Sequence, residues 1–410
     1  MDVANIVIGL LCIGIITDAF LLYAKSKPIT GQRNCKQRFS NGDDNSIELS
    51  ISNAYSFPIN ADVIDELPVQ LQERNWHRSI ALKAGETNKI DYSIRPVERG
   101  EYLFGRILVF VQSPLRFIKR RCAIERTETV YVYPSYVQMR KYQLLAATHQ
   151  LSEVGSKRVR KIGNSTEFEQ IKDYVRGDDY RTVNWKATAR KGQLMVNTYV
   201  DEKSQQIYCL IDKSRSMKMP FEGLTLLDYA INASLVLSNV TLYKQDKAGL
   251  ITFAQKVDTF LPAERTPGQM ELILNDLYAQ QTDFLDADFG AVYAQVRAKI
   301  KQRSLLILFT NFESMYGLER QMPVLRKLAH YHLLVVVFFE NTEIASVVKQ
   351  EAKTTEDIYI KTIAEKFAYE KRLLVKELHK NGILSLLTPP QQLTANTINK
   401  YLDIKIRNLI

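Results

Sequence analysis

The sequence predicts three successive structural parts: an N-terminal membrane helix, a small antiparallel β-sandwich, and a doubly wound α/β domain. Three observations support this. The first two dozen residues are almost wholly apolar, residues 46–132 show a hydrophobic period of two, and from residue 204 apolar strands alternate with amphipathic helices. We expect the boundaries 1–24, 25–140, 141–203 and 204–410, the third range being a junction between the two domains.

The apolar run from Val3 to Ala24 contains one charged residue, Asp18. At about 1.5 Å per residue the run extends about 33 Å, which is enough to cross a hydrocarbon core of about 30 Å. A secretory signal peptide is the alternative, but signal peptides carry basic residues before a shorter apolar region, and no basic residue precedes this run. Because a carboxylate is costly at membrane depth, we expect Asp18 to be paired, protonated or close to the interface.

Basic residues follow the apolar run directly, with no acidic residue between Ala24 and Phe39. They are Lys25, Lys27, Arg33, Lys36 and Arg38. The positive-inside rule then puts the bulk of the chain in the cytoplasm, behind a single membrane helix. The run begins almost at the first residue, so a further membrane helix could precede it in a longer protein. Four scattered cysteines without a CxxC pair agree with a reducing compartment.

Short alternating or apolar stretches predict strands at 46–52, 88–94, 106–112 and 128–134. Turn signals such as Asn41-Gly42 separate them. Strands at a spacing of roughly ten residues favour a small antiparallel sandwich. This part contains no candidate catalytic cluster, so we interpret it as a spacer or interaction module.

The segment 157–191 is rich in Lys and Arg, which is typical of a nucleic-acid contact. Acidic residues are interleaved with the basic ones, however, and stacking aromatic residues are sparse. Phosphate binding needs a patch of one sign, so we favour an organising structural motif.

The same segment predicts local structure. Thr166 and Glu169 stand at the spacing of a capping box, which predicts a short helix over 167–175. Beyond it, we expect Asp178 and Asp179 to meet arginines in a buried ion network, the candidates being Arg181 and Arg190.

From residue 204 the pattern predicts alternating strands and helices. The strands are 205–212, 248–254, 257–263, 304–312, 332–340 and 383–389, and the helical segments are 224–244, 267–280, 288–302, 317–331, 343–381 and 391–409. Continuous apolar strands between helices indicate a mostly parallel sheet covered on both faces. Ligands of such folds bind at the carboxyl ends of the strands.

A polar motif stands at the carboxyl end of the first of these strands, where Asp212 is followed by Ser214 and Ser216. One carboxylate and two hydroxyls at alternate positions can converge on a hard divalent cation. The alternative is that the two serines cap a turn or a helix start.

Two stretches of the sequence resemble known families. The apolar strand that ends in DKSRSM resembles the von Willebrand factor A fold with its metal ion-dependent adhesion site. EFEQIKDYVRGDDYRTVNWKATARKGQLMVNTY, which begins at Glu167, resembles the signature of the bacterial domain of unknown function fifty-eight (DUF58) family, in which an anchored chain carries a β-domain and then a von Willebrand A-like domain. The stretches 99–117 and 388–410 are also similar to that family, so the resemblance covers nearly the whole chain.

The resemblance implies further ligands for the metal, Mg²⁺ or Mn²⁺. Thr282 stands where a threonine of a second loop belongs, and Asn311 stands where an aspartate is expected after the central strand. An amide supplies no charge, so Asn311 should lower the affinity and make the site a degenerate one. The implied metal set is Asp212, Ser214, Ser216, Thr282 and Asn311.

The sequence contains no GxxxxGK[ST], HExxH or GxSxG motif, and its five histidines form no i, i+4 pair. We therefore predict no catalytic residue and interpret the protein as an interaction or adaptor module. The family resemblance implies a MoxR-type AAA+ ATPase as partner, an assembly or chaperone-like role, and the bacterial inner membrane as location. The alternatives are a metal-dependent hydrolase that uses Asp212 and a nucleic-acid-binding protein that uses 157–191.

Overall fold

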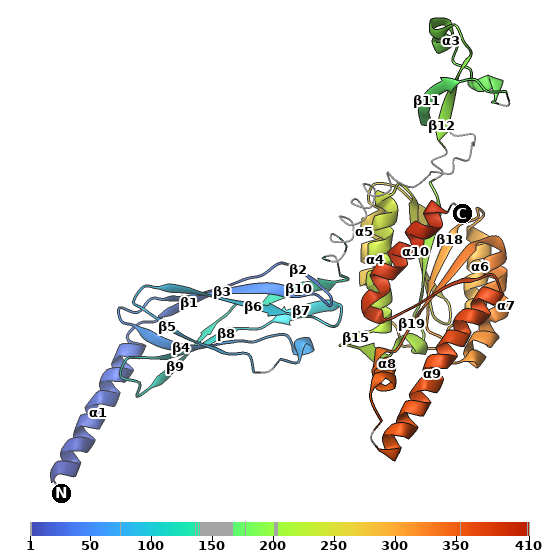
Figure 1. Cartoon of the computed structure of the whole chain (residues 1–410). Coiled ribbons are helices and arrows are strands. Elements are labelled where there is room, and N and C mark those ends of the chain that lie inside the picture. Colours follow the sequence, from blue (N-terminus) through green and yellow to red (C-terminus); the bar gives the residue numbers. More distant parts are fainter. Residues whose placement is uncertain are drawn as a thin grey trace. The chain divides into compact units, whose positions relative to one another are not determined.

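The computed structural model describes residues 2–73, 75–135, 137, 139, 167–176, 178–200, 204–352, 354–407 and 409 (Figure 1). The internal contacts divide the chain into two compact units. The first comprises residues 1–139, 219–235 and 274–281, and the second comprises residues 140–218, 236–273 and 282–410.

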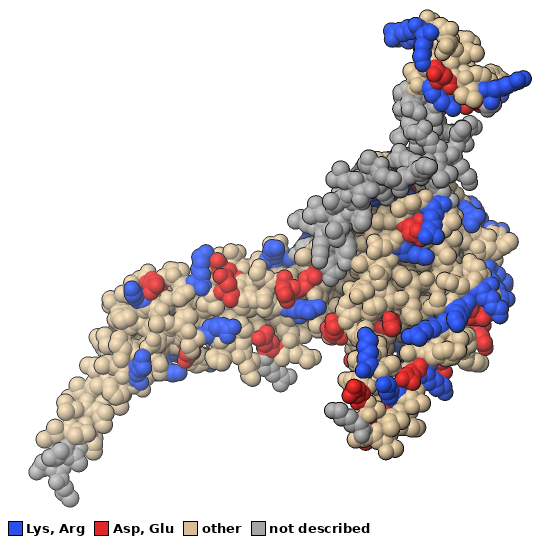
Figure 2. Space-filling view, in the orientation of Figure 1, with Lys and Arg blue, Asp and Glu red and all other residues tan. Residues whose placement is uncertain are grey.

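The N-terminal apolar run forms the helix α1 (Asp2–Tyr23). Its segment Asn5–Tyr23 is long and apolar enough to cross a membrane, a property shared by membrane anchors and signal sequences. On the face shown in Figure 2, the described part of α1 shows no Lys, Arg, Asp or Glu. Asp18 and Leu22 near its end are fully buried. The last turns of α1 therefore belong to a packed structure rather than to a free helix.

The part after α1 is an antiparallel β domain, as predicted. Its strands are β1 (Ile29–Asn34), β2 (Arg38–Ser40), β3 (Asn45–Asn53), β4 (Ile59–Asp65), β5 (Arg78–Leu82), β6 (Thr87–Ile94), β7 (Gly100–Phe104), β8 (Ile107–Gln112), β9 (Lys119–Ile124) and β10 (Glu128–Tyr133). They form the sheets β1-β3-β6, β5-β4-β8-β9 and β2-β10-β7, and every pair is antiparallel except β2–β10. In β3 the buried side chains alternate, as a period of two requires.

One buried ion pair lies in the core of the β domain. The Arg33 guanidinium donates two hydrogen bonds to the Asp65 carboxylate, and both side chains are fully buried. The Tyr92 hydroxyl donates to the same carboxylate. Arg33 also donates to the carbonyl oxygens of Gly105 and Arg126. The charges are thus enclosed by a nearly complete set of hydrogen-bond partners, as a buried pair needs.

The segment 167–200 forms a hairpin of β11 (Glu167–Asp173) and β12 (Met195–Val200), with a 3-10 turn (Tyr180–Thr182) and the short helix α3 (Trp185–Lys191) between them. The predicted helix over 167–175 is wrong. Pairing with β12 supplies the backbone hydrogen bonds of this stretch, and such tertiary pairing overrides a capping signal carried by two residues. A bulge between Phe168 and Gln170 absorbs one extra residue in the ladder.

The C-terminal domain is mixed α/β with a mostly parallel sheet, as predicted. The strand order is β17-β16-β13-β18-β19-β20, and only β17 runs antiparallel to its neighbour. The strands are β13 (Gln206–Asp212), β16 (Lys247–Phe253), β17 (Val257–Glu264), β18 (Leu305–Phe309), β19 (Leu333–Phe339) and β20 (Leu384–Thr388). In the central strand β18 every residue is buried, which is why its sequence is continuously apolar.

Helices cover both faces of this sheet. They are α4 (Leu226–Tyr243), α5 (Gln269–Tyr278), α6 (Phe289–Lys299), α7 (Met315–Tyr331), α8 (Thr342–Lys349), α9 (Thr355–Lys380) and α10 (Leu393–Ile406). Apolar side chains of α6, α7 and α9 share one core with side chains from alternate positions of the strands. Figure 1 shows α10 on the other side of the sheet, where it contacts β20. The single helical segment predicted over 343–381 is two helices, α8 and α9.

Candidate functional site

The candidate site lies at the carboxyl end of β13, where Asp212 is the last residue of the strand. The Asp212 side chain is almost fully buried, and burial raises the pKa of its carboxyl group. Its Oδ1 accepts a hydrogen bond from the backbone N–H of Ser214 at 2.8 Å, and its Oδ2 accepts one from the Thr310 hydroxyl at 2.6 Å. The two bonds hold the carboxylate in one orientation, facing the loop that follows β13.

The two serines of the motif face each other in that loop. The Oγ atoms of Ser214 and Ser216 are 3.1 Å apart. A 3-10 turn (Arg215–Met217) begins directly after Ser214, but the Ser214 hydroxyl makes no capping hydrogen bond to it. The hydroxyls are therefore directed toward each other and are not used as helix caps.

Thr282 reaches the same loop from the segment between α5 and α6. Its hydroxyl donates to the carbonyl oxygen of Lys213 at 2.7 Å and accepts from the backbone N–H of Phe284 at 3.0 Å. The first bond attaches the 282–284 segment to the residue next to Asp212. Thr282 is thus adjacent to the motif.

Asn311 follows β18 and closes the cluster. Its Nδ2 donates to the carbonyl oxygen of Ser216 at 3.2 Å, while its Oδ1 accepts from the Lys371 ammonium at 2.8 Å. Lys371 comes from α9 and donates a second bond, at 2.6 Å, to the carbonyl oxygen of Phe312. Burial lowers the pKa of the Lys371 ammonium to about 8. A positive charge thus lies against the amide that stands in place of a carboxylate.

The structure therefore brings all five sequence-predicted residues to one edge of the sheet. It also adds Thr310 and Lys371, which the sequence reasoning missed. One signal for Lys371 exists, since it precedes the buried Leu374 and Leu378 at i, i+3 and i+7, which is the spacing of a single helix face. A lysine within the apolar stripe of a helix needs a polar partner, and Asn311 is that partner.

The oxygen ligands of this site are of the kind that a hard cation prefers, but they carry too little negative charge to bind one tightly. Carboxylate, hydroxyl and amide oxygens are the ligands that Mg²⁺ and Mn²⁺ prefer. Asp212 is the one carboxylate among the five residues. Within the part of the chain that the structure describes, no three His, Cys, Asp or Glu side chains form a group that could hold a metal ion. With an ammonium beside Asn311, the site suits weak cation binding.

Charged side chains of both signs lie around the loop. The Lys213 ammonium pairs with the Asp258 carboxylate at 2.7 Å. Arg215 is exposed, and the ammonium of the exposed Lys218 lies 5.7 Å from the centre of the Phe284 ring.

The basic segment 157–191 is described only in part, because residues 157–166 lie outside the described residues. In the described part, Lys172 pairs with Asp178 at 2.9 Å and Lys191 pairs with Asp173 at 2.8 Å. The predicted buried ion network of Asp178 and Asp179 with arginine side chains is wrong. Asp178 bonds to Lys172, and Asp179 accepts from the backbone N–H of Arg181 at the start of a 3-10 turn.

Comparison with known sequences gives one family match and one curated relative. Residues 170–369 match the family described as "Protein of unknown function DUF58". The chain is 25% identical over 187 residues to the "Uncharacterized protein YeaD" of Bacillus subtilis (strain 168), which covers 44% of this chain. The chain spans about half of that relative's length, 46%.

Comparison with solved structures gives likenesses at low sequence identity. The antiparallel β domain resembles the PapD-like domain 7 of human CEP192, with 12% identity, a TM-score of 0.20, and coverage of 27% of this chain and 88% of that one. It also resembles the CARDB domain of PF1109 from Pyrococcus furiosus, with 14% identity, a TM-score of 0.20, and coverage of 25% and 91%. Proximal thread matrix protein 1 from the mussel byssus is 14% identical, with a TM-score of 0.26 and coverage of 48% and 46%.

Proposed function

Since the chain carries a DUF58 family domain over residues 170–369, we propose that it is a membrane-anchored interaction protein whose C-terminal domain binds an acidic side chain of a partner. The observation that carries the proposal is the gathering of Asp212, Ser214, Ser216, Thr282 and Asn311 around one loop. The family resemblance suggests a MoxR-type AAA+ ATPase as the partner, in an assembly or chaperone-like role.

A divalent cation would be held by the Asp212 carboxylate and by the hydroxyls of Ser214 and Ser216, with Thr282 and Asn311 beside them. When bound, Mg²⁺ or Mn²⁺ would supply an open coordination position to an oxygen of the partner's carboxylate. Thr310 holds the Asp212 carboxylate through its hydroxyl. Lys371 places a positive charge beside Asn311, which lowers metal affinity and favours an anionic partner.

The anchor part of the proposal is supported by the end of α1. A cleaved signal peptide would be removed close to the end of its apolar region. Here Asp18 and Leu22 are fully buried, and the carbonyl oxygen of Leu22 accepts hydrogen bonds from the Tyr55 hydroxyl and the Arg120 guanidinium. The β domain uses this end of the helix in its own packing, which favours a retained anchor.

Calorimetric titration of the detergent-solubilised full chain with Mn²⁺ tests the metal part. We expect weak binding, with a dissociation constant in the range of about 0.1 to 1 mM, and its loss in Asp212→Ala. Asp403→Ala, which removes an equal charge from α10, is the matched control and should bind like the wild type. A wild-type chain that binds neither Mn²⁺ nor Mg²⁺ at millimolar concentration would contradict the metal part of the proposal.

Capture of a purified MoxR-type ATPase from the same organism tests the partner. The immobilised full chain should retain the ATPase, and Asp212→Ala should retain less of it. If retention is the same for the wild type, Asp212→Ala and a bead control, this adaptor proposal fails even where metal binds.

A further inference from the structure

The one carboxylate of the apolar helix is enclosed by a loop of the β domain. Oδ2 of Asp18 accepts hydrogen bonds from the backbone N–H groups of Phe117 and Ile118, both at 2.9 Å, and Oδ1 accepts one from the Ser113 hydroxyl. The loop 113–118, which joins β8 to β9, therefore binds the side of α1. Its three donors replace the water that Asp18 would lose at membrane depth.

The same loop extends along the apolar part of α1 beyond Asp18. A Cβ built on Gly14 would lie 3.1 Å from the Phe117 ring, so this ring lies against the helix at Gly14. Gly14 is four residues nearer the N-terminus than Asp18, which is about 6 Å along a helix axis. Phe117 nevertheless remains 48% exposed and Leu115 remains 46% exposed. The loop thus presents apolar side chains alongside the apolar helix rather than burying them.

Asp18 places this loop at the membrane interface. The segment Asn5–Tyr23 is long and apolar enough to cross a membrane, and Asp18 lies in its last two turns. A carboxylate costs least where a membrane helix reaches the interface. Because the loop 113–118 is bonded to Asp18, it lies at the same level as these turns.

The residues around this end of the β domain are those of a membrane interface. Phe20 and Tyr23 of α1 are exposed, and the Arg120 guanidinium lies 4.8 Å from the centre of the Tyr23 ring. Arg116 is exposed between Leu115 and Phe117, and its backbone takes the left-handed conformation with φ 61°. Aromatic and basic side chains together are enriched where acyl chains meet headgroups. A strained non-glycine residue at a loop tip is typical of a functional loop.

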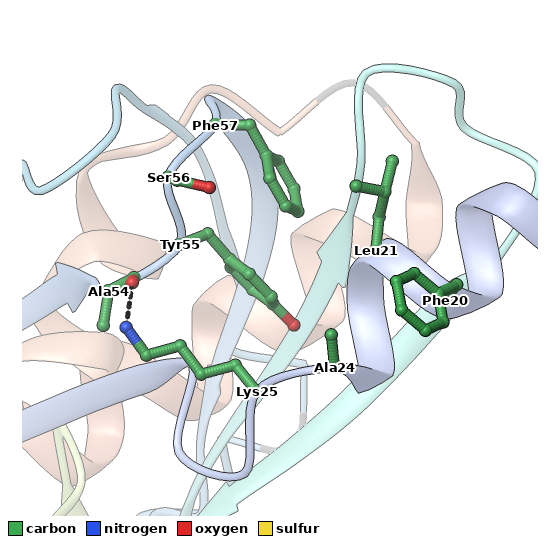
Figure 3. A pocket seen from close by; sticks show the side chains of 8 residues that line it. All are labelled: Phe20, Leu21, Ala24, Lys25, Ala54, Tyr55, Ser56 and Phe57. Carbon is green, nitrogen blue, oxygen red and sulfur yellow. Dashed lines mark hydrogen bonds between the residues drawn. The ribbon is translucent and has the colours of Figure 1, made fainter.

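A pocket of about 290 Å³ opens at the same level (Figure 3). It is lined by Phe20, Leu21, Ala24 and Lys25 and by residues 54–57 of the β domain. Figure 3 shows the rings of Phe20, Tyr55 and Phe57 around it, with the Lys25 ammonium bonded to the carbonyl oxygen of Ala54. This is an apolar wall with a positive charge at its rim, which matches an acyl chain below a phosphate headgroup.

We propose that the loop 113–118 is a membrane-docking element: Leu115 and Phe117 insert into the interfacial layer of an anionic phospholipid bilayer, while Arg116 and Arg120 lie at the phosphate level. The inference rests on the proposed membrane anchor and extends it. The β domain would be held to the bilayer by a second contact besides α1, so its orientation to the membrane is restricted.

Fluorescence quenching by brominated lipid tests this. The full chain is reconstituted in vesicles of phosphatidylglycerol and a brominated phosphatidylcholine. The bromine of this phosphatidylcholine lies near the headgroup end of one acyl chain. Phe117→Trp keeps an aromatic ring against Gly14 and adds a fluorophore at the loop. We expect the bromine to remove most of the emission that this substitution adds. The native Trp76 and Trp185 give the baseline, which is measured on the unsubstituted chain.

Val69→Trp is the matched control, because Val69 is exposed at the opposite end of the β domain. In the antiparallel pairing of β4 with β8, Asn60 pairs with Gln112 at the end near the loop, and Asp65 pairs with Ile107 at the far end. Val69 follows β4 beyond that far end. The bromine should not quench the emission that Val69→Trp adds. Leu115→Trp repeats the test if Phe117→Trp fails to fold.

Equal quenching of the loop and Val69 variants, in a chain that stays in the vesicles after alkaline washing, overturns the docking loop. A chain that the wash removes from the vesicles contradicts the anchor itself, so the two failures are distinguishable.

Discussion

The ammonium of Lys371 lies 2.8 Å from Oδ1 of Asn311, at the carboxyl end of the central strand β18. The family resemblance implies a carboxylate at this position and a metal ion near it. The chain has an amide and a positively charged side chain from α9 instead. The electrostatic balance of the site is thus set by a residue that is distant in the sequence from the Asp212 motif.

Removal of this ammonium should strengthen metal binding. Lys371→Met keeps an apolar stem of similar length and removes the charge, so a divalent cation near Asn311 loses a repulsion worth at least about 1.4 kcal/mol, or about tenfold in affinity. Titration of the full chain with Mn²⁺ measures the change. Lys376→Met, at an exposed position of the same helix, should leave the affinity unchanged. An unaltered affinity in Lys371→Met would mean that the ammonium does not oppose a cation there.

The buried pair of Arg33 and Asp65 should be essential to the β domain. Asp65→Ala leaves a fully buried guanidinium without its carboxylate and should lower the free energy of unfolding by about 3–5 kcal/mol. Trp76 reports the unfolding in urea, because it is buried in this core and its ring lies 4.5 Å from that of Tyr92.

The exposed pair of Lys89 and Glu48 provides the comparison for Asp65→Ala. Its Lys89 side chain is 64% exposed, so Glu48→Gln should cost no more than about 1 kcal/mol. Equal losses in the two variants would contradict the importance assigned to the buried pair.

His332 should make the C-terminal sheet less stable in mild acid. It is 4% exposed, and burial, together with the charges of Arg297 and Arg303, lowers the pKa of its imidazole below 6.5. Among the described residues its Nδ1 has no hydrogen-bond partner. The unfolded chain therefore binds a proton that the folded chain resists. The His332 imidazole therefore costs no stability above about pH 6.5. Below that pH it lowers the free energy of unfolding by at most about 1.4 kcal/mol per pH unit.

Hydrogen exchange of β18 and β19 amides between pH 7 and pH 5, corrected for intrinsic rates, measures this effect. His332→Leu should remove part of the acid-dependent loss of protection, whereas His379→Gln, at an exposed position, should not. If His332→Leu retains the full pH dependence, another group is responsible for it.

Hydrophobic periodicity predicted the six strands of the C-terminal sheet but only four of the ten strands of the β domain, namely β3, β6, β8 and β10. The alternation in 46–52 and 88–94 became β3 and β6, and the continuous apolar stretch 304–312 became the central strand β18. These segments are predictable because a strand that is buried on one face has alternating apolar residues, and a strand that is buried on both faces has a continuous apolar run. The segment 167–175 was wrongly predicted because its structure depends on a partner strand more than twenty residues away, which no local signal encodes.

The sequence by itself determined the apolar N-terminal helix, the change from a β-rich part to an α/β part, and the position of the Asp212 motif at the end of a strand. Only the tertiary structure decided that Lys371 lies against Asn311 and that Asp18 is enclosed by the loop 113–118. The reason is physical. A strand or helix is selected by the period of its own side chains, whereas the partner of a buried charge is chosen by how distant elements pack, and the cost of leaving that charge unpaired makes the choice specific.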